Sequence, residues 1–235
     1  MNSMKTVGII GGLGPETTAN FYLEVVFSFF EKNKETRPPM LLWNVPIPNK
    51  VEEEFITSTK GGEVYVPLLV DAAKRLEKGG ADFIVIPCNS VHMFIDNVRK
   101  AVKIPVLSII EETVAFLNEQ KVKEVGILAT SVTLRKKLYE HAFSKSGIRS
   151  QAPSDENQAK MGRIIRNLVA SRYTEEDRVQ LLFIIEQFIV QGVQTVILAC
   201  TDLQMLAPEH EQVRIYDTMK ILADSTISEL LKEKK

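Results

Sequence analysis

The sequence predicts an α/β protein in which two similar halves are each built on a mainly parallel sheet. Short β-branched runs alternate with longer stretches of helical periodicity, which is the pattern of β-α-β units. An internal repeat points to the two halves, because residues 80–89 match residues 192–201 without a gap. Each copy carries one of the two cysteines of the chain, Cys88 and Cys200.

The expected elements follow one another along all 235 residues. Strands are expected at the β-branched runs Thr6–Ile10, Met40–Val45, Phe83–Ile86, Val106–Ser108, Glu124–Leu128, Thr195–Leu198 and Arg214–Tyr216. Helices are expected between them, at Glu16–Glu31, Val66–Glu77, Val91–Val102, Glu111–Glu119, Leu134–Phe143, Gln158–Ala170, Glu175–Val190 and Met219–Lys232. In the segment 66–77, Leu69, Ala73 and Leu76 share one face, so this face is expected to be buried.

The repeat extends beyond the cysteines and predicts two pseudo-symmetric, Rossmann-like domains. Similar runs open the halves at residues 7–10 and 125–128, and the runs 105–108 and 214–217 are expected to be corresponding late strands. The first domain is predicted to span residues 1–110, joined by the C-terminal segment 211–235, and the second to span residues 111–210. Ligands of such folds bind beyond the carboxyl ends of the strands. The active site is therefore expected in the cleft between the domains.

Bulk composition excludes several classes of function. The formal net charge of -1 gives no reason to expect a nucleic acid or an anionic membrane as partner. No apolar run approaches the roughly 20 residues that a bilayer crossing requires, and the apolar patch at the N-terminus is too short for a secretory signal. Two cysteines favour free thiols in a reducing cytoplasm, although a single disulfide is compatible with the sequence.

The paired cysteines are the main indication of chemistry. Cys88 and Cys200 are each expected to follow a strand and to precede a helix, where the helix dipole can lower a thiol pKa. A single buried cysteine is usually a small hydrophobic residue. Two cysteines at equivalent strand ends instead indicate a pair of thiols that face one pocket. That arrangement suits an enzyme that moves a proton across a carbon centre.

Residues that follow the cysteines are candidates for supporting roles. The pairs Asn89-Ser90 and Thr201-Asp202 suit N-cap positions whose side chains hold the turn. His92 lies one helical turn after Cys88, where it could poise the thiol, bind a carboxylate or simply pack within the helix. The three histidines, at positions 92, 141 and 210, have no metal-ligand spacing, so no metal site is expected.

Two loops are weaker candidates for anion binding. The turn with Gly12 and Gly14 leads from a strand into a helix, so its N–H groups could hold an anion, although a tight structural turn is an equal possibility. The dinucleotide fingerprint G-x-G-x-x-G is not met there, and the hydrolase motif G-x-S-x-G is absent from the chain. Lys50, in a proline-bounded loop, could pair with a substrate carboxylate. The acidic run 52–54 is expected to be a solvated face.

Several motifs together resemble the aspartate/glutamate racemase family over nearly the whole chain. They are GIIGGLGPETTANFY from Gly8, PCNSVH from Pro87, IPVLSIIEET from Ile104, VGILATSVT from Val125, ACTDL from Ala199 and YDT from Tyr216. The resemblance implies two pseudo-symmetric α/β domains, a site in the cleft between them, a homodimer and no cofactor, pyridoxal phosphate included. It also implies that the two cysteines are the acid/base pair, and that the α-carboxylate and ammonium ligands are Asn89, Ser90, Thr130 and Thr201.

The chain departs from the family pattern where a distal carboxylate would bind. Many aspartate racemases have a P-D-R-T loop where this chain has a lysine, Lys50, which keeps the charge but loses the bidentate fork of arginine. Lys160 lies near the second carboxylate-binding lysine of the family, one residue away from it. Asp202 replaces the commoner glutamate after the second cysteine-threonine pair.

These observations predict a cytoplasmic amino-acid racemase that acts on aspartate or glutamate through a thiol and a thiolate. Two alternatives stay open. The first is a related two-thiol enzyme, of the maleate isomerase, hydantoin racemase or decarboxylase type. The second is a protein that binds an amino acid without catalysis.

Overall fold

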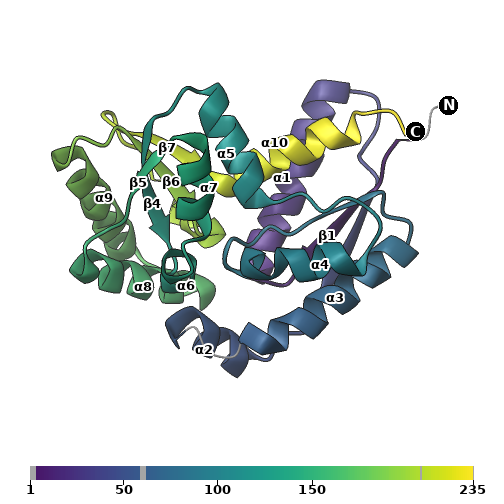
Figure 1. The fold of residues 1–235 in the computed structure, drawn as a ribbon, viewed down its shortest axis with the longest axis horizontal. Helices are drawn as coiled ribbons and strands as arrows, with labels where there is room; N and C mark the ends of the chain where they lie inside the picture. Colours follow the sequence, from purple (N-terminus) through teal and green to yellow (C-terminus); the bar gives the residue numbers. More distant parts are fainter. Residues whose placement is uncertain (1–3, 59–61, 207, 235) are drawn as a thin grey trace.

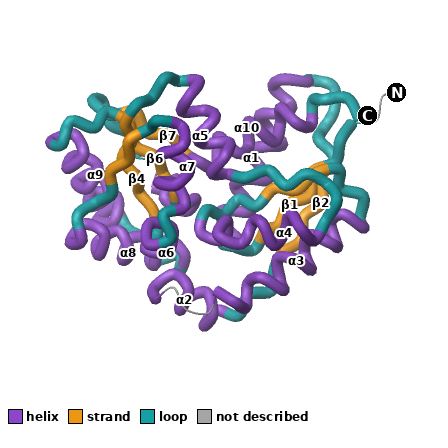
Figure 2. The backbone as a smooth tube through the Cα atoms, in the orientation of Figure 1, coloured by secondary structure: helices purple, strands orange, loops and turns teal. Residues whose placement is uncertain are grey.

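The computed structural model describes residues 4–58, 62–206 and 208–234, and its core consists of two parallel sheets (Figure 1, Figure 2). The first sheet has the order β2-β1-β3, with β1 at Val7–Gly11, β2 at Met40–Asn44 and β3 at Phe83–Val85. The second has the order β5-β4-β6-β7, with β4 at Glu124–Ala129, β5 at Arg149–Gln151, β6 at Thr195–Ala199 and β7 at Arg214–Asp217. All strand pairings are parallel, which confirms the predicted fold class.

The two sheets repeat the same strand pairings. Gly8 of β1 pairs with Ile84 of β3, and the equivalent residues of the second half, Gly126 and Val196, pair in the same way. The turns that lead into β3 and β6 also correspond, because each contains a glycine with positive φ, at residues 80 and 192. Only glycine adopts such a conformation without strain. The sequence repeat is therefore a repeat of backbone geometry.

The late strands correspond as well. Ile215 of β7 pairs with Val196, and Val106 forms a parallel bridge to Ile84, which is the equivalent of Val196. The bridge at Val106 is isolated, so the first sheet has no full fourth strand where the sequence predicts one.

Helices fill the intervals between the strands. They are α1 (Pro15–Asn33), α2 (Asn49–Ser58), α3 (Gly62–Lys78), α4 (Ile95–Ala101), α5 (Ile109–Glu119), α6 (Ser131–Arg135), α7 (Leu138–Ser146), α8 (Asp155–Val169), α9 (Glu175–Val190) and α10 (Thr218–Leu230). Short 3-10 helices follow the cysteines, η1 at Ser90–Phe94 and η2 at Thr201–Leu206.

Further elements differ from the sequence-based prediction. The single helix expected at Val91–Val102 is divided into η1 and α4. Lys50, expected in a proline-bounded loop, lies instead in α2, which begins at Asn49. The single helix expected at 134–143 is divided into α6 and α7, because Lys137 adopts a left-handed conformation with φ of 51°. Strand β5 was not expected, since its three residues, Arg-Ser-Gln, carry no β-type signal.

A central core joins the two halves. It contains residues from β1 and β3 together with residues from β4, β6, α7 and α10. Helix α10 packs against both α1 and α5, and Figure 1 shows it running from the second sheet toward α1. Separate clusters cover the outer faces of the sheets, with α3 on the first and with α8 and α9 on the second. Within the described ranges, no helix combines the length and the apolar character needed to cross a membrane.

Candidate active site

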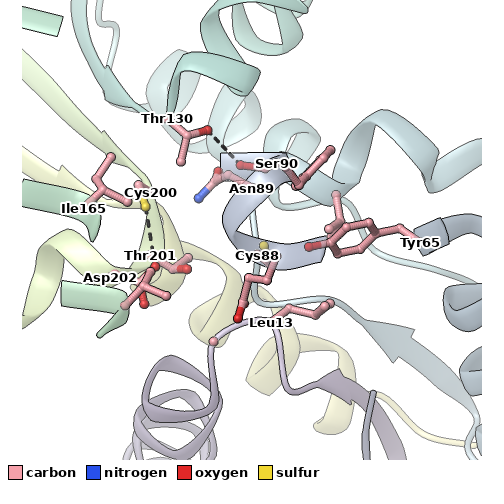
Figure 3. Close-up of a pocket in the computed structure, with 15 residues that line it drawn as sticks. Leu13, Tyr65, Cys88, Asn89, Ser90, Thr130, Ile165, Cys200, Thr201 and Asp202 are labelled. Carbon is pink, nitrogen blue, oxygen red and sulfur yellow. Dashed lines mark hydrogen bonds between the residues drawn. The ribbon is translucent and has the colours of Figure 1, made fainter. Parts of the chain in front are cut away.

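A pocket lies at the carboxyl ends of β3 and β6, between the two halves (Figure 3). Its lining comes from both sheets and from the helices next to them: Leu13, Gly14, Glu52, Phe55, Tyr65, Cys88, Asn89, Ser90, Val91, Thr130, Ile165, Val169, Cys200, Thr201 and Asp202. Figure 3 shows the two cysteines on different elements of the pocket wall. The two thiols that the repeat predicts to be equivalent therefore meet in a single pocket.

Each thiol lies at the start of a 3-10 helix. Backbone N–H groups of Ser90 and Val91 bond to the sulfur of Cys88, and the N–H of Asp202 bonds to the sulfur of Cys200. These donors favour the thiolate, but burial outweighs them. Burial, reinforced by the charge of Asp202, raises the pKa of Cys88 to about 12 and raises the pKa of Cys200 well above its usual range. These shifts favour the protonated form of both thiols at neutral pH.

Asp202 joins the second thiol to the first helix. The Cys200 thiol donates to Asp202 Oδ2 at 3.6 Å, and the Thr17 hydroxyl donates to Asp202 Oδ1 at 2.6 Å. Because Thr17 belongs to the first turn of α1, the carboxylate lies at the positive end of that helix. Burial nevertheless raises the pKa of Asp202. The sequence predicts that the turn with Gly14 could hold an anion. The acidic group next to Gly14 in the structure is the side chain of Asp202.

The residue after each cysteine contacts the opposite half of the molecule. The Asn89 amide donates to the Thr218 hydroxyl at 3.1 Å and accepts from the Tyr139 phenol. The Thr201 hydroxyl donates to the carbonyl oxygen of Pro87, which precedes Cys88, at 3.4 Å. Asn89 and Thr201, which the resemblance implies to be substrate ligands, line the pocket, and their side chains also hold the two cysteine turns together.

A triangle of hydroxyls makes a further link between the halves. Ser90 Oγ lies 2.9 Å from Thr130 Oγ1 and 3.2 Å from Thr133 Oγ1, and the two threonine oxygens lie 3.1 Å apart. Thr130 also caps α6 by accepting from the Thr133 N–H. The predicted ligands Ser90 and Thr130 thus lie side by side in the pocket wall, where Figure 3 shows their contact.

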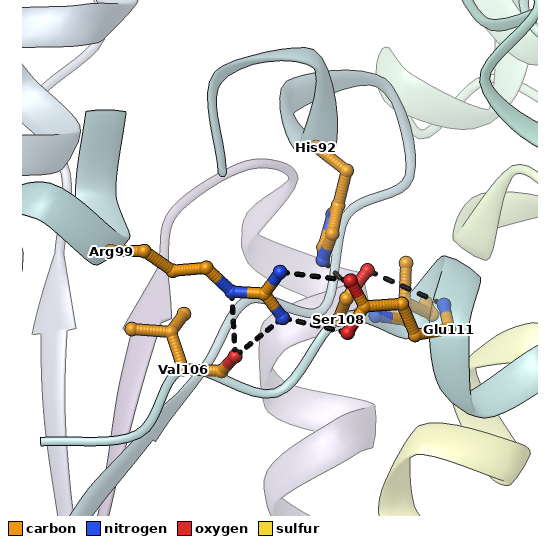
Figure 4. Close-up of polar contacts among 6 residues, drawn as sticks. His92, Arg99, Val106, Ser108 and Glu111 are labelled. Carbon is orange, nitrogen blue, oxygen red and sulfur yellow. Dashed lines mark hydrogen bonds and ion pairs between the residues drawn. The ribbon is translucent and has the colours of Figure 1, made fainter. Parts of the chain in front are cut away.

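The side chain of His92 is buried (Figure 4), where it links two backbone segments, and it does not line the pocket. Its Nε2 accepts from the Ile109 N–H at 3.1 Å, so the ring proton is on Nδ1, which donates to the Cys88 carbonyl oxygen at 2.7 Å. Burial lowers the pKa of His92 to about 4. The neutral ring therefore ties the Cys88 turn to the start of α5. Of the roles that the sequence allows, packing within the fold is the one the structure favours.

Three other predicted residues lie outside the pocket lining. Lys50 is exposed in the first turn of α2, where a loop was expected. Lys160 pairs with Glu156 at 2.8 Å and lies 5.3 Å from the centre of the Phe183 ring, on the outer side of α8. Gly12 donates its N–H to the Thr18 hydroxyl within the turn before α1. The structure thus brings neither predicted carboxylate-binding lysine to the thiols.

Sequence reasoning missed Glu52 and Tyr65. Glu52, expected in a solvated face, is half-buried and lines the pocket from the first turn of α2. The side chain of Glu53 lies outside the described part, and Glu54 is exposed as expected. Pro48, followed within four residues by an acidic run, is a signal for a helix start that would have revealed α2. Tyr65, whose phenol Figure 3 shows directed toward Cys88, belongs to no chemical motif.

In the described ranges, no group of three or more His, Cys, Asp or Glu side chains could hold a metal ion.

Comparison with known proteins assigns the chain to a family. The family model for Asp/Glu/hydantoin racemases matches residues 10–226. The chain belongs to the Asp/Glu/hydantoin racemase family.

Proteins described as racemases or racemase homologues resemble the chain over nearly its whole length. This chain is 26% identical over 231 residues to the broad-specificity amino-acid racemase RacX of Bacillus subtilis. The match covers 96% of this chain and 98% of that protein. A crystal structure from Yersinia pestis, of a protein assigned as an Asp/Glu racemase, superposes with a TM-score of 0.84 at 26% identity, covering 97% of this chain and 100% of the other. An aspartate racemase homologue from Pyrococcus horikoshii gives a TM-score of 0.80 at 27% identity, with coverage of 97% and 100%.

Proposed function

We propose that this protein racemises a free amino acid with two thiols and without pyridoxal phosphate. The observation that carries the proposal is the meeting of Cys88 and Cys200 in one pocket, from equivalent positions of two repeated sheets. Membership in the racemase family supports the reaction class. The cytoplasmic location and the homodimer remain predictions from the sequence.

In the proposed reaction one cysteine is a thiolate and the other a thiol. The thiolate removes the α-proton, and the electron pair of the broken C–H bond is delocalised from the α-carbon onto the substrate carboxylate. The opposite thiol then donates its proton to the other face of the carbon and becomes the thiolate. The roles exchange for the other enantiomer, so the protonation states belong to the coupled pair.

The protein must first provide a thiolate, which burial and the charge of Asp202 disfavour. A substrate ammonium close to the sulfurs would lower both thiol pKa values, because an opposite charge favours the ionised form. Asp202 is placed to take the proton of Cys200, since it already accepts a hydrogen bond from that thiol. Backbone N–H groups at the start of η1 and η2 would stabilise whichever cysteine is the thiolate.

Aspartate or glutamate is the substrate that the family resemblance favours, and this choice remains a prediction. The Bacillus subtilis relative is described as having broad specificity. Related two-thiol reactions, such as isomerisation of maleate, racemisation of a hydantoin or decarboxylation, would need the same pair of thiols. Binding without catalysis would need only the polar pocket.

Exchange of the substrate α-hydrogen in D2O tests the proposal. The wild-type protein is expected to incorporate deuterium at Cα and to convert either enantiomer of its substrate to the racemate. Cys88→Ala and Cys200→Ala should each abolish racemisation, whereas Ser146→Ala, at the end of α7, serves as a control expected to be neutral. Full turnover in either cysteine variant would exclude a mechanism that needs both thiols.

A further inference from the structure

The charges of the pocket bear on the substrate side chain. Two carboxyl groups, Glu52 and Asp202, belong to the lining, and the described lining includes no lysine, arginine or histidine. Both lysines with which the sequence could have neutralised an acidic side chain, Lys50 and Lys160, lie outside it. A second carboxylate on the substrate would therefore meet negative charges with no cation beside them.

Of the two acids, Asp202 has hydrogen-bond partners within the protein, whereas the described residues provide none for Glu52. Asp202 accepts from the Thr17 hydroxyl and from the Cys200 thiol. Glu52 is half-buried, and in the described part of the chain no hydrogen bond or ion pair links it to a cation. Burial raises the pKa of Glu52, and the charge of Asp202 raises it further. A positively charged group of a ligand beside Glu52 would favour its ionised form and so oppose both increases in its pKa.

Glu52 reaches the pocket from a different element than the groups around the α-carbon. The cysteines and the hydroxyls of Ser90 and Thr130 come from strand ends and the turns that follow them, so they surround the α-carbon and its charged groups. Glu52 instead comes from α2, which packs against α6 of the other half (Figure 1) and contributes Glu52 and Phe55 to the pocket lining. A side chain that extends from the α-carbon toward α2 would end near the Glu52 carboxylate.

Much of the pocket lining is apolar. Leu13, Phe55, Ile165 and Val169 line the pocket together with the ring of Tyr65. Lysine and arginine side chains match such a path, because they combine an apolar methylene stem with a charged end.

We propose that Glu52 determines specificity, and that the preferred substrates are amino acids whose side chain is a methylene stem ending in a cation. This inference rests on the proposed racemisation and concerns the substrate class at the same site. It replaces the acidic side chain that the family resemblance favours.

A panel of amino acids tests the inference on the full chain. L-lysine, L-arginine and L-ornithine are compared with L-methionine, L-aspartate and L-glutamate, by deuterium incorporation at Cα and by circular dichroism. The cationic substrates should exceed the acidic ones in kcat/KM by about 100-fold or more, and methionine should fall between them.

Glu52→Gln isolates the role of the carboxylate. It should lower kcat/KM for lysine relative to methionine by about 10-fold or more, mainly through KM. The ratio between the two substrates is the readout, because loss of the charge also changes the pKa of Cys88 for every substrate. Glu63→Gln, an exposed acid at the start of α3, is the matched control and should leave the ratio unchanged.

The outcomes separate the two proposals. Absence of deuterium incorporation with every amino acid would overturn the racemisation itself. Incorporation with a preference for aspartate or glutamate, the result expected if a protonated Glu52 donated to a substrate carboxylate, would overturn only the inference about the side chain. An unchanged lysine-to-methionine ratio in Glu52→Gln would also overturn it.

Discussion

The Cys200 thiol donates a hydrogen bond to the carboxylate of Asp202, two residues further along the chain, at 3.6 Å. This contact connects the second thiol to a group that can accept its proton. Asp202 is buried and is held by the Thr17 hydroxyl from the other half of the molecule. Its charge also raises the pKa of both thiols, so it opposes thiolate formation electrostatically while it offers a site for the proton.

Replacement of Asp202 by asparagine should therefore lower the pKa of the Cys200 thiol, because the negative charge next to the sulfur is lost. The chain has two cysteines, so a Cys88→Ser background leaves one thiol, and its ultraviolet thiolate absorbance can be followed against pH. Racemisation by Asp202→Asn with both cysteines present should fall by about 100-fold or more, because the proton acceptor is lost. A rise in the thiol pKa would contradict this account.

The pH dependence of kcat/KM follows from the protonated thiols. Burial raises the pKa of Cys88 to about 12, so the thiolate fraction of the free enzyme increases with pH throughout the neutral range. We expect kcat/KM to rise about tenfold per pH unit between roughly pH 6.5 and 8.5. A pH–rate profile for one enantiomer measures this slope. A plateau at neutral pH would mean that a thiolate is already present in the free enzyme.

Buried His92 should make the fold sensitive to acid. Its pKa is about 4 in the folded protein and near 6.5 in the unfolded chain, so unfolding takes up a proton as the pH falls between these values. The stability that this neutral ring contributes is fully present above pH 6.5 and is lost as the pH falls through about 4, a change of about 3 kcal/mol.

Denaturant unfolding at a series of pH values measures this loss. His92→Gln keeps a donor and an acceptor but has no titrating group, so the variant should lose about 3 kcal/mol less than the wild type between these pH values. His141→Gln, at an exposed position of α7, is the matched control and should follow the wild type. Identical acid curves for the wild type and His92→Gln would exclude the role of the buried ring.

Gly12 should tolerate no side chain. Its φ is 82°, and a Cβ atom there would lie 2.8 Å from Asn44 Oδ1 and 2.9 Å from the backbone nitrogen of Val45. Gly12→Ala is expected to reduce the free energy of unfolding by about 2 kcal/mol or more, through backbone strain and crowding. The control is Gly162→Ala in α8, where the nearest contact is Arg166 Nη1 at 3.6 Å and a gain of up to about 1 kcal/mol is expected. A stable Gly12→Ala protein would contradict the geometry of this turn.

Much of the fold could be predicted because its signals are local. Strands β1, β2, β3, β4, β6 and β7 coincide with the short runs predicted to be strands, and the repeat of the glycine turns anticipates the equivalent pairings of Ile84 and Val196. Strand β5 and helix α2 escaped prediction. The first is too short and polar to carry a pattern, and the second is stabilised by packing against α6 across the cleft.

Side-chain direction in the site was not predictable. Lys160 points to Glu156 and Phe183, and His92 points to the Cys88 carbonyl and to Ile109, although each lies near a motif that the sequence singles out. Glu52 and Glu54 belong to the same acidic run, yet one lines the pocket and the other faces solvent. Each of these differences depends on an element from another part of the chain.

The sequence by itself determined two parallel sheets, their internal repeat and a matched pair of thiols, because periodicity and repetition are written in neighbouring residues. Asp202 accompanies Cys200 through its place in the chain, but tertiary structure alone decided the other charges near the thiols. The placement of α2 brings Glu52 to the pocket, and Lys50 of α2 and Lys160 of α8 lie outside the lining. Burial among those residues, which no local pattern encodes, then sets the pKa of each thiol.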